Sequence, residues 1–336
     1  MLIELAENGW VPDAGIRIGI RQLLKKRLEQ EASFEDYRGL LAELKASEIA
    51  IETDAANDQH YELPADFFVQ VLGKHLKYSS CYWQANTSTL DDAELEMLKL
   101  YAQRAELEDG QVVVDLGCGW GSFSLWAAQA YPNSRFIAVS NSHGQREFIE
   151  AQAAARNLGN LEVRTCDIND LDLTERADRI VTVEMLEHVR NYQSLFERMS
   201  GWLKPGGKLF VHIFCNRSLM YPYVEKSKDD WMTKYFFTGG LMPAADTLLH
   251  FQEKLHLEDR WQLSGTHYAK TCRAWLEKLD ERRDQVRAVL ADAYGEAEAD
   301  RWTQRWRMFF MSCEELFAYD GGREWMVCHY RFVNRV

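Results

Sequence analysis

QVVVDLGCGWG, residues 111–121, is a short apolar run that ends in a glycine-rich turn, and the helical pattern SFSLWAAQAY follows it directly. Glycines at a strand–turn–helix junction let the chain turn tightly and bring backbone N–H groups close to a ligand at the helix N-terminus. A dinucleotide fingerprint has the spacing G-x-G-x-x-G, whereas Asp115, Gly117, Gly119 and Gly121 give D-x-G-x-G-x-G. A carboxylate on the strand favours a cofactor with an amino-acid moiety and a cation over a pyrophosphate. The alternative is a glycine-rich turn that binds no ligand.

Four further segments repeat the strand signal, and a helix-compatible stretch separates each from the next: RFIAVS (135–140), LEVRTCD (161–167), RIVTVE (179–184) and GKLFVHIF (207–214). Strands that alternate with helices are typical of a parallel, doubly wound α/β sheet. The apolar runs are continuous, as expected for strands that are covered on both faces. We therefore predict an α/β fold whose ligands lie outside the carboxyl ends of the strands.

The segments on either side of this region have other patterns, and they predict a chain of four parts. Residues 1–95 form a helical cap, 96–215 the cofactor-binding core, 216–322 a mostly helical substrate lid with a sixth strand near 258–263, and 323–336 the final strand.

The composition is that of an ordinary globular protein, with 336 residues, 46% hydrophobic and 27% charged. Its 39 basic and 52 acidic residues give a net charge of −13, which disfavours nucleic acid and stable membrane association and tolerates cationic substrates. No apolar run reaches the length of a membrane span and no secretory signal is visible, so we expect a cytoplasmic protein. Seven cysteines without a CxxC pair, and histidines without ligand spacing, predict reduced thiols and no metal.

A second motif, EMLEH, follows the fourth predicted strand and places Glu184, Glu187 and His188 within five residues. Neighbouring carboxylates raise one another's pKa and that of a nearby histidine, which favours proton acceptance near neutral pH. The alternative is a solvated helix N-terminus, where the helix dipole favours Glu. The position at a strand end makes this motif a candidate for catalysis.

The glycine-rich turn resembles the S-adenosylmethionine-binding motif of class I methyltransferases. Together with YSSCYW (78–83), SNSHGQREFI (140–149), KYFFTGGLMP (234–243) and EWMVCHYRF (324–332), it resembles the coclaurine N-methyltransferase family. That family methylates the amines of benzylisoquinoline alkaloids and is similar in turn to cyclopropane-fatty-acid synthases. The resemblance implies a class I methyltransferase fold, with a Rossmann-like sheet of seven strands, and S-adenosylmethionine as the cofactor.

The resemblance also implies which residues bind the cofactor: Tyr78, Ser79, Asp115, Gly117, Gly119, Asn141, Gln145, Asp167 and Ile168. The second strand lacks the acidic residue that the superfamily uses for the ribose hydroxyls, and Asn141 and Gln145 take its place. Asp167 would accept a hydrogen bond from the exocyclic amine of adenine, although a lone Asp after a strand also serves as a helix cap.

On the substrate side, the resemblance implies that Glu184, Glu187 and His188 face the amine and that Glu187 and His188 manage its proton. The other implied substrate contacts are His212, Trp231, Tyr235, Phe236, Tyr268, Trp306 and Phe309. The aromatic residues among them would form the lid, and ordinary core packing is the alternative for each one. The expected partner is a small-molecule amine, and the sequence leaves open whether the chain forms a homodimer.

Two other functions remain as alternatives to amine methylation. Cyclopropane synthases hold a bicarbonate base with a loop cysteine, a glutamate, a histidine and a tyrosine, and Glu187, His212 and Tyr268 stand at matching positions. Cys81 lies one residue beyond the place of that cysteine, which Ser80 occupies, so methylation of a lipid alkene is the first alternative. The second is a non-catalytic module that binds S-adenosylmethionine. The favoured hypothesis is methyl transfer to a tetrahydroisoquinoline or an aryl-alkylamine.

Overall fold

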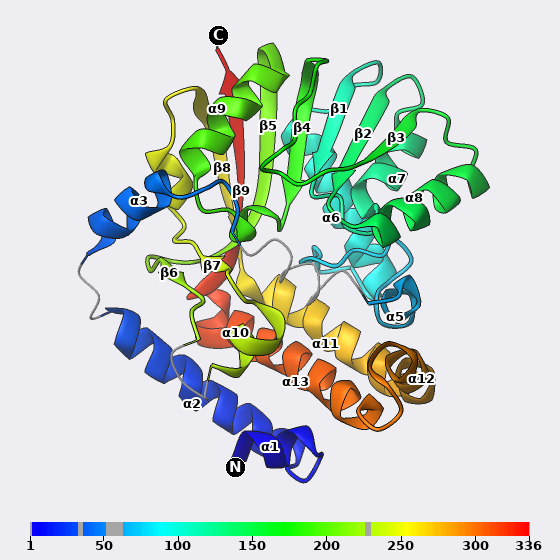
Figure 1. Ribbon diagram of the computed structural model, residues 1–336, viewed down its shortest axis with the longest axis vertical. Coiled ribbons are helices and arrows are strands. Elements are labelled where there is room, and N and C mark those ends of the chain that lie inside the picture. The colour runs from blue at the N-terminus through cyan, green and yellow to red at the C-terminus, as the bar shows by residue number, and fades with distance from the viewer. Residues whose placement is uncertain (1, 33–35, 52–62, 226–229, 336) are drawn as a thin grey trace.

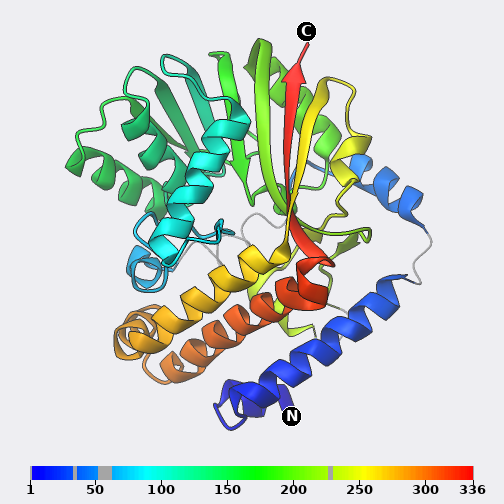
Figure 2. The same cartoon turned by 180° about the vertical axis from the view of Figure 1, so that it is seen from behind.

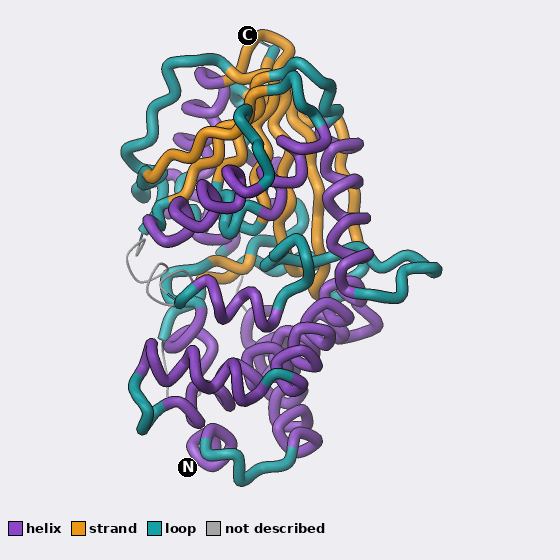
Figure 3. The backbone as a smooth tube through the Cα atoms, turned by 90° about the vertical axis from the view of Figure 1, so that its right-hand side faces the viewer, coloured by secondary structure: helices purple, strands orange, loops and turns teal. Residues whose placement is uncertain are grey.

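The computed structural model describes residues 2–32, 36–51, 63–225 and 230–335. A sheet with helices on its faces lies above a layer of helices, as Figure 1 shows and the side view of Figure 3 separates more clearly. The sheet has seven strands in the order β3-β2-β1-β4-β5-β9-β8, which confirms the expected class of fold. Their bounds are β1 Val112–Leu116, β2 Arg135–Ser140, β3 Leu161–Thr165, β4 Ala177–Val183, β5 Leu203–Asn216, β8 Leu255–Leu263 and β9 Trp325–Asn334.

The sheet is mixed: its first five strands are parallel and one of its last two strands is antiparallel to its neighbours. Strands β1 to β5 pair in parallel, whereas β9 runs antiparallel to both β5 and β8. The chain leaves β8 at the end of the sheet that faces the helical layer, and it passes through helices before it returns. Because it returns from the same end, β9 must run in the opposite direction to its neighbours.

Helices cover both faces of the sheet. On one face α9 (Tyr192–Trp202) packs on β5, and α3 (Tyr37–Ala46) packs on α9. On the opposite face, seen in Figure 2, α6 (Leu90–Ala105) lies against β5 and α7 (Ser122–Ala130) against β2. Helix α8 (His143–Ala155) packs beside β3. The buried, continuously apolar strands agree with this double cover.

The helical layer is built on a long antiparallel pair, α11 (Gly265–Glu281) and α13 (Ala299–Ala318). Helix α2 (Asp13–Ala32) packs on α13, and ion pairs fix it there, since Arg17 binds Glu314 at 2.7 Å and Glu315 at 2.9 Å. The layer also contains α1 Leu2–Glu7, α5 Ala65–Val71, α10 Trp231–Phe236 and α12 Arg283–Tyr294. Short elements complete the described chain: η1 Leu186–His188, β6 Tyr221–Pro222, β7 Leu241–Met242, η2 Thr247–His250 and η3 Tyr319–Gly322.

The arrangement places the carboxyl ends of β1 to β5 against the helical layer (Figure 1). The first helices do not pack as one body, because α1 and α2 contact α13, α3 contacts α9, and α5 contacts α11 and α12. The division of the chain into four parts stays a prediction. No helix in the described ranges is both long enough and apolar enough to span a membrane.

Candidate active site

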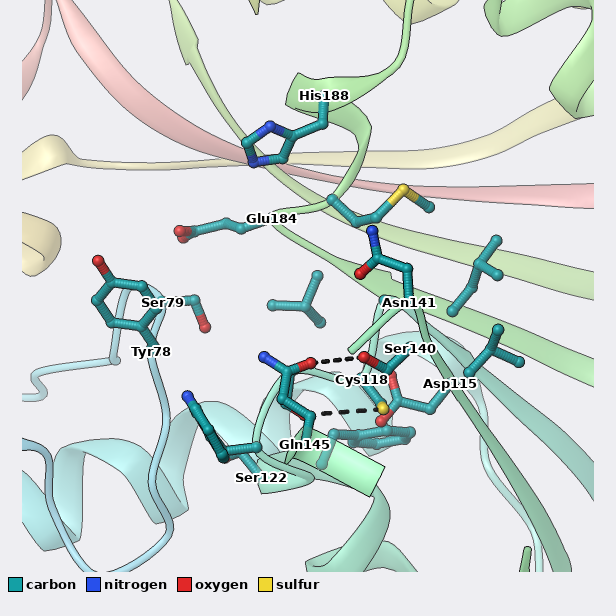
Figure 4. Close-up of a pocket in the computed structure, with 18 of the residues that line it drawn as sticks. Tyr78, Ser79, Asp115, Cys118, Ser122, Ser140, Asn141, Gln145, Glu184 and His188 are labelled. Atoms are coloured by element: carbon teal, nitrogen blue, oxygen red, sulfur yellow. Dashed lines mark hydrogen bonds between the residues drawn. The ribbon is translucent and has the colours of Figure 1, made fainter. Parts of the chain in front are cut away.

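A cavity lies at the carboxyl ends of β1, β2 and β4, and we call it the strand-end cavity. Figure 4 shows side chains that converge on it from these strands and from the loop that bears Tyr78 and Ser79. All nine residues predicted to bind a cofactor line this cavity: Tyr78, Ser79, Asp115, Gly117, Gly119, Asn141, Gln145, Asp167 and Ile168. The structure therefore brings together residues that are up to ninety positions apart in the sequence.

The glycine-rich turn lines the strand-end cavity. Its backbone adopts left-handed conformations that favour glycine, and the lack of side chains leaves room beside it. Gly117 has a φ of 80°, and a Cβ there would lie 2.6 Å from Cγ of Met185. Gly119 has a φ of 53°, and nothing lies within 4 Å of the position that its Cβ would take. Since Gly119 lines the cavity, a side chain there would occupy space that is open to a ligand. Asp115 lies behind the turn, buried and hydrogen-bonded by the hydroxyl of Ser124.

Polar groups after β2 and β3 point into the same cavity. The hydroxyl of Ser140 donates to Oε1 of Gln145 at 2.6 Å, which turns the amide nitrogen of Gln145 toward the cavity (Figure 4). That nitrogen is buried and has no hydrogen-bond partner among the described residues, so it is a donor available to a ligand. One carboxylate oxygen of Asp167 accepts a hydrogen bond from the N–H of Asn169 at 2.7 Å. Asp167 thus caps a turn and lines the cavity at once.

A second cavity, of about 690 Å³, lies between the sheet and the helical layer. We call it the aromatic cavity because aromatic rings line it from β5, α10, α11, α13 and the residues that directly follow β6 and α10: Phe214, Tyr223, Trp231, Phe237, Tyr268, Trp275, Phe309 and Phe317. Among the residues that the structure describes, three line both cavities, namely Tyr78, Glu184 and His188. A ligand in one cavity therefore meets a ligand in the other at these three side chains.

Glu184 is held at this junction by three hydrogen bonds. Its Oε1 accepts from the backbone N–H of Ser80 at 2.9 Å and lies 2.9 Å from Nε2 of His212, and its Oε2 accepts from the hydroxyl of Tyr268 at 2.5 Å. Its backbone φ of 47° is in the left-handed region, where strain is tolerated mainly at functional positions. Burial raises the pKa of Glu184 to about 7, against the charge of Lys77, which lowers it.

His188 faces the junction from the end of η1, and its ring lies 5.2 Å from that of Phe237. Burial and the positive charge of Arg190 lower the pKa of His188 to about 4. The imidazole is therefore neutral near pH 7, where a neutral ring nitrogen can accept a hydrogen bond or a proton. Two side chains at the junction can act on an amine, one as a carboxylate and one as an imidazole.

Glu187 does not face the junction, which corrects the expectation that it meets the substrate amine. It lines neither cavity and is fully buried, because the turn η1 directs it under β5, where its Oε1 accepts from the N–H of Phe214 at 2.9 Å. Burial, and then the negative charge of Glu184, raise the pKa of Glu187 well above its ordinary value. The carboxylate that meets Tyr268 and His212 is therefore Glu184.

The predicted substrate residues divide into two groups. Trp231, Tyr268 and Phe309 line the aromatic cavity, as expected. His212, Tyr235, Phe236 and Trp306 line neither cavity.

Each residue of the second group has another partner. His212 stands behind Glu184, and Phe236 stacks on Phe309 at 4.4 Å between ring centroids. Trp306 packs on Phe67 at 4.5 Å, and Tyr235 lies 4.1 Å from the guanidinium of Arg305. Phe236 and Trp306 also contact the wall residue Phe309, and Tyr235 contacts the wall residue Trp231, so these three aromatic residues pack behind the wall and do not form it, which corrects their predicted role.

The sequence did not single out several residues of the site. Lys77 is fully buried beside the junction, where its ammonium donates to Ser79 and, at 2.8 Å, to the carbonyl of Ser80. Phe214 and Phe317 line the aromatic cavity from β5 and α13, although their patterns are those of ordinary core residues. The position of Lys77, directly before the predicted cofactor residues Tyr78 and Ser79, was the one local feature of the sequence that could have pointed to it.

The loop cysteine of the lipid alternative is absent from the junction. Cys81 is fully buried, lines neither cavity, and has its N–H 3.1 Å from the hydroxyl of Thr271, to which it donates. Burial raises the pKa of its thiol well above the ordinary value. At the place of that cysteine, Ser80 offers a backbone N–H to Glu184.

Comparisons with known proteins point to one family. The family described as mycolic acid cyclopropane synthetase matches residues 50–323. The chain is 39% identical over 344 positions to (S)-coclaurine N-methyltransferase of Thalictrum flavum subsp. glaucum, which covers 99% of this chain and 95% of that protein. It is 36% identical over 343 positions to the enzyme of the same name from Papaver somniferum, with 99% and 98% covered.

A solved structure is similar over nearly the whole chain. The crystal structure of coclaurine N-methyltransferase bound to N-methylheliamine and SAH has a TM-score of 0.93 and 38% identity, and 98% of each chain is covered. The nine predicted cofactor residues, the two joined cavities and these likenesses agree. The chain belongs to the coclaurine N-methyltransferase-like family, within the S-adenosylmethionine-dependent methyltransferases that are related to cyclopropane-fatty-acid synthases.

Proposed function

We propose that the chain transfers a methyl group from S-adenosylmethionine to the nitrogen of a small aromatic amine of the tetrahydroisoquinoline class. The observation that carries the proposal is that Tyr78, Glu184 and His188 line both cavities. S-adenosylmethionine in the strand-end cavity would present its methyl group at this junction, and an amine in the aromatic cavity would present its nitrogen there. The relatives from Thalictrum flavum and Papaver somniferum that are named (S)-coclaurine N-methyltransferase support this class of acceptor.

The reaction needs an unprotonated nitrogen in line with the methyl carbon and the sulfur. The nitrogen lone pair forms the new C–N bond while the C–S bond breaks and its electron pair stays on sulfur, which leaves S-adenosylhomocysteine. Holding the two partners in line is the larger part of the task, because the sulfonium is already activated. The shared walls of the two cavities would supply this alignment.

An alkylammonium with a pKa of about 10, like that of lysine, has no lone pair to donate until it loses a proton. Glu184 is the group placed to bind that cation and take its proton, because Tyr268, Ser80 and His212 hold its carboxylate at the junction. The neutral imidazole of His188 is a second acceptor at the same place. A positioned base contributes about 10²–10⁴-fold to such a step.

The aromatic cavity favours a flat, largely apolar amine. Rings of Phe214, Phe237, Tyr268 and Phe317 line it near the junction, and they attract a cation through their faces while they exclude water. A cavity of about 690 Å³ is large enough for a two-ring amine with an aryl substituent.

The test is a panel of acceptors with methyl-labelled S-adenosylmethionine. The panel contains tetrahydroisoquinolines with and without a benzyl group, aryl-alkylamines, phenols and vesicles of unsaturated phospholipid. The proposal predicts label on nitrogen and the highest kcat/KM for the tetrahydroisoquinolines. Label in cyclopropane or methylated acyl chains, with none on amines, would favour the lipid alternative. Binding of S-adenosylmethionine with transfer to no acceptor in the panel would contradict the proposal.

A further inference from the structure

A row of hydrogen-bonded side chains runs from Glu184 across one face of the sheet, the face that α6 covers. The cross-strand register places His212 on β5 directly opposite His329 on β9. Nε2 of His212 lies 2.9 Å from Oε1 of Glu184, and Nδ1 of His212 lies 2.9 Å from Nε2 of His329. Nδ1 of His329 lies 2.7 Å from the guanidinium of Arg104 on α6. The row thus links the junction to α6, the helix that lies across the face of the sheet shown in Figure 2.

Arg104 fixes the direction of every hydrogen bond in this row. A guanidinium has only donors, and although burial lowers the pKa of Arg104 to about 10, it remains protonated at neutral pH. Burial lowers the pKa of both His212 and His329 well below the ordinary value, so each ring is neutral and carries one N–H. Nδ1 of His329 must therefore accept from Arg104, and its proton is on Nε2.

The tautomer of His329 in turn determines that of His212. Nε2–H of His329 donates to Nδ1 of His212, so the proton of His212 is on Nε2 and points at Glu184. The opposite tautomer of His212 would aim a lone pair at the carboxylate of Glu184, which is repulsive. The phenol of Tyr101 lies 2.8 Å from Nδ1 of His212 and can donate there too. A hydroxyl also accepts, so Tyr101 alone cannot select the tautomer.

We propose that Arg104 is a positioning residue for Glu184, which it holds ionised and oriented toward the amine through the tautomers of His329 and His212. The proposal rests on the proposed function, in which Glu184 takes the proton of the amine. Arg104, on α6, lines neither cavity, so it acts only through the row. The aromatic ring of Trp261, 4.8 Å from the guanidinium, keeps Arg104 in place.

Other titratable groups face the row, and none of them in the described part of the chain donates to Nδ1 of His329 in place of Arg104. Lys77, from the loop before Tyr78, adds positive charge near both histidines, and its ammonium is bound to Ser79 and Ser80. Tyr268 from α11 bonds the other oxygen of Glu184. Through the hydrogen bonds of the row, the guanidinium on α6 orients the N–H of His212 toward the carboxylate of Glu184.

The experiment combines a spectroscopic and a kinetic measurement on the full chain. Ring ¹⁵N–¹H correlation spectra of protein labelled at histidine report which nitrogen carries each proton, and the loss of one ring's signals in His329→Asn and His212→Asn assigns them. The variants are Arg104→Met, which removes the donor, and Arg104→Lys, which restores a donor that cannot accept. Lys99→Gln, an exposed charge on the same helix, is the matched control.

The proposal predicts the Nε2–H tautomer on His212 and His329 in the parent protein throughout the neutral range. Arg104→Met should mix the tautomers, lower kcat about tenfold with little change in KM, and shift the acid limb of the kcat profile upward by about one unit, because the ionised carboxylate loses support. Arg104→Lys should recover most of the Nε2–H tautomer and most of kcat. Lys99→Gln should match the parent in both measurements.

Two results would overturn the proposal: the Nδ1–H tautomer or a protonated ring at His212 in the parent, or a parent-like acid limb in folded Arg104→Met. The tautomers are read from the parent spectrum without substrate, once the two rings are assigned, so this measurement distinguishes the proposal from the proposed function. Absence of amine methylation by the parent would contradict the proposed function, whatever the tautomers are.

Discussion

Glu184 and His188 stand four residues apart on the turn that follows β4, and both line the strand-end cavity and the aromatic cavity. Leu186 and Glu187, which lie between them, are fully buried. The turn η1 causes this division, since it directs positions 184 and 188 to both cavities and the side chains of Leu186 and Glu187 to the core. One carboxylate and one neutral imidazole therefore meet at the place where the two ligands would meet.

Substituting Gly119 by Val should abolish cofactor binding and leave the fold intact. Valine at a φ of 53° is strained, and its side chain would enter space that is open to the cofactor. Isothermal titration with S-adenosylmethionine should show a loss of affinity of at least about 100-fold, or about 2.7 kcal/mol. Circular dichroism provides the check on folding, and unchanged affinity in a folded variant would mean that the turn has only a structural role.

Glu94→Gln should loosen the loop that carries Tyr78 and Ser79. The buried carboxylate of Glu94 accepts from the backbone N–H groups of Gly73 at 2.9 Å, His75 at 2.7 Å and Lys77 at 3.2 Å. A glutamine amide places a donor against one of these donors, which should cost about 1–3 kcal/mol of unfolding free energy. We expect a lower midpoint in urea and a higher KM for S-adenosylmethionine. Glu96→Gln, at a partly exposed position of the same helix, is the control.

Cys81→Ser should retain most of the activity on amines. The thiol lies in the interior and lines neither cavity, so it cannot hold an anion at the junction. The measurement is kcat/KM with a tetrahydroisoquinoline, with and without added bicarbonate, and the thermal midpoint of the variant corrects for any loss of folded protein. A loss of several orders of magnitude together with a need for bicarbonate would indicate the cyclopropane-type mechanism.

The rate at saturating amine should rise with pH through about 7. Burial raises the pKa of Glu184 to about 7, so its carboxyl is protonated below that pH and cannot take the proton of the amine. Above that pH the ionised form predominates and the rate should reach a plateau. His188, with a pKa lowered to about 4, stays neutral over this range, so its titration does not change the rate between pH 5.5 and 8.5. A kcat profile that is flat between pH 5.5 and 8.5, which brackets the pKa of about 7, would exclude Glu184 as the base.

The cofactor side of the site could be predicted from the sequence because its signals are local. Gly117 and Gly119 lie within one strand–turn–helix unit, and the polar residues Asn141 and Asp167 lie at the ends of the next two predicted strands. Parallel strands bring all of these ends to one edge of the sheet, which the order of elements predicts, and the family resemblance then named the residues there.

The substrate side could not be predicted to the same depth because it depends on contacts between distant segments. EMLEH does not reveal which carboxylate faces the ligand, since the N–H of Phe214 on β5 draws Glu187 into the core. Helical periodicity gives Trp306 and Phe309 the same face of α13, but only Phe309 borders the cavity. The pairing of His212 with His329 depends on the antiparallel register of a strand more than a hundred residues later.

The most direct test is the rate of methyl transfer by Glu184→Gln in a single turnover, with S-adenosylmethionine bound beforehand and a tetrahydroisoquinoline in excess. The account predicts a rate about 10²–10⁴-fold below that of the parent at pH 7.5 and a partial recovery at higher pH, where solution supplies the neutral amine. Tyr268→Phe, which removes one donor to the same carboxylate, should fall between the two. A parent-like rate for Glu184→Gln at pH 7.5, in a variant that binds both ligands, would contradict the account.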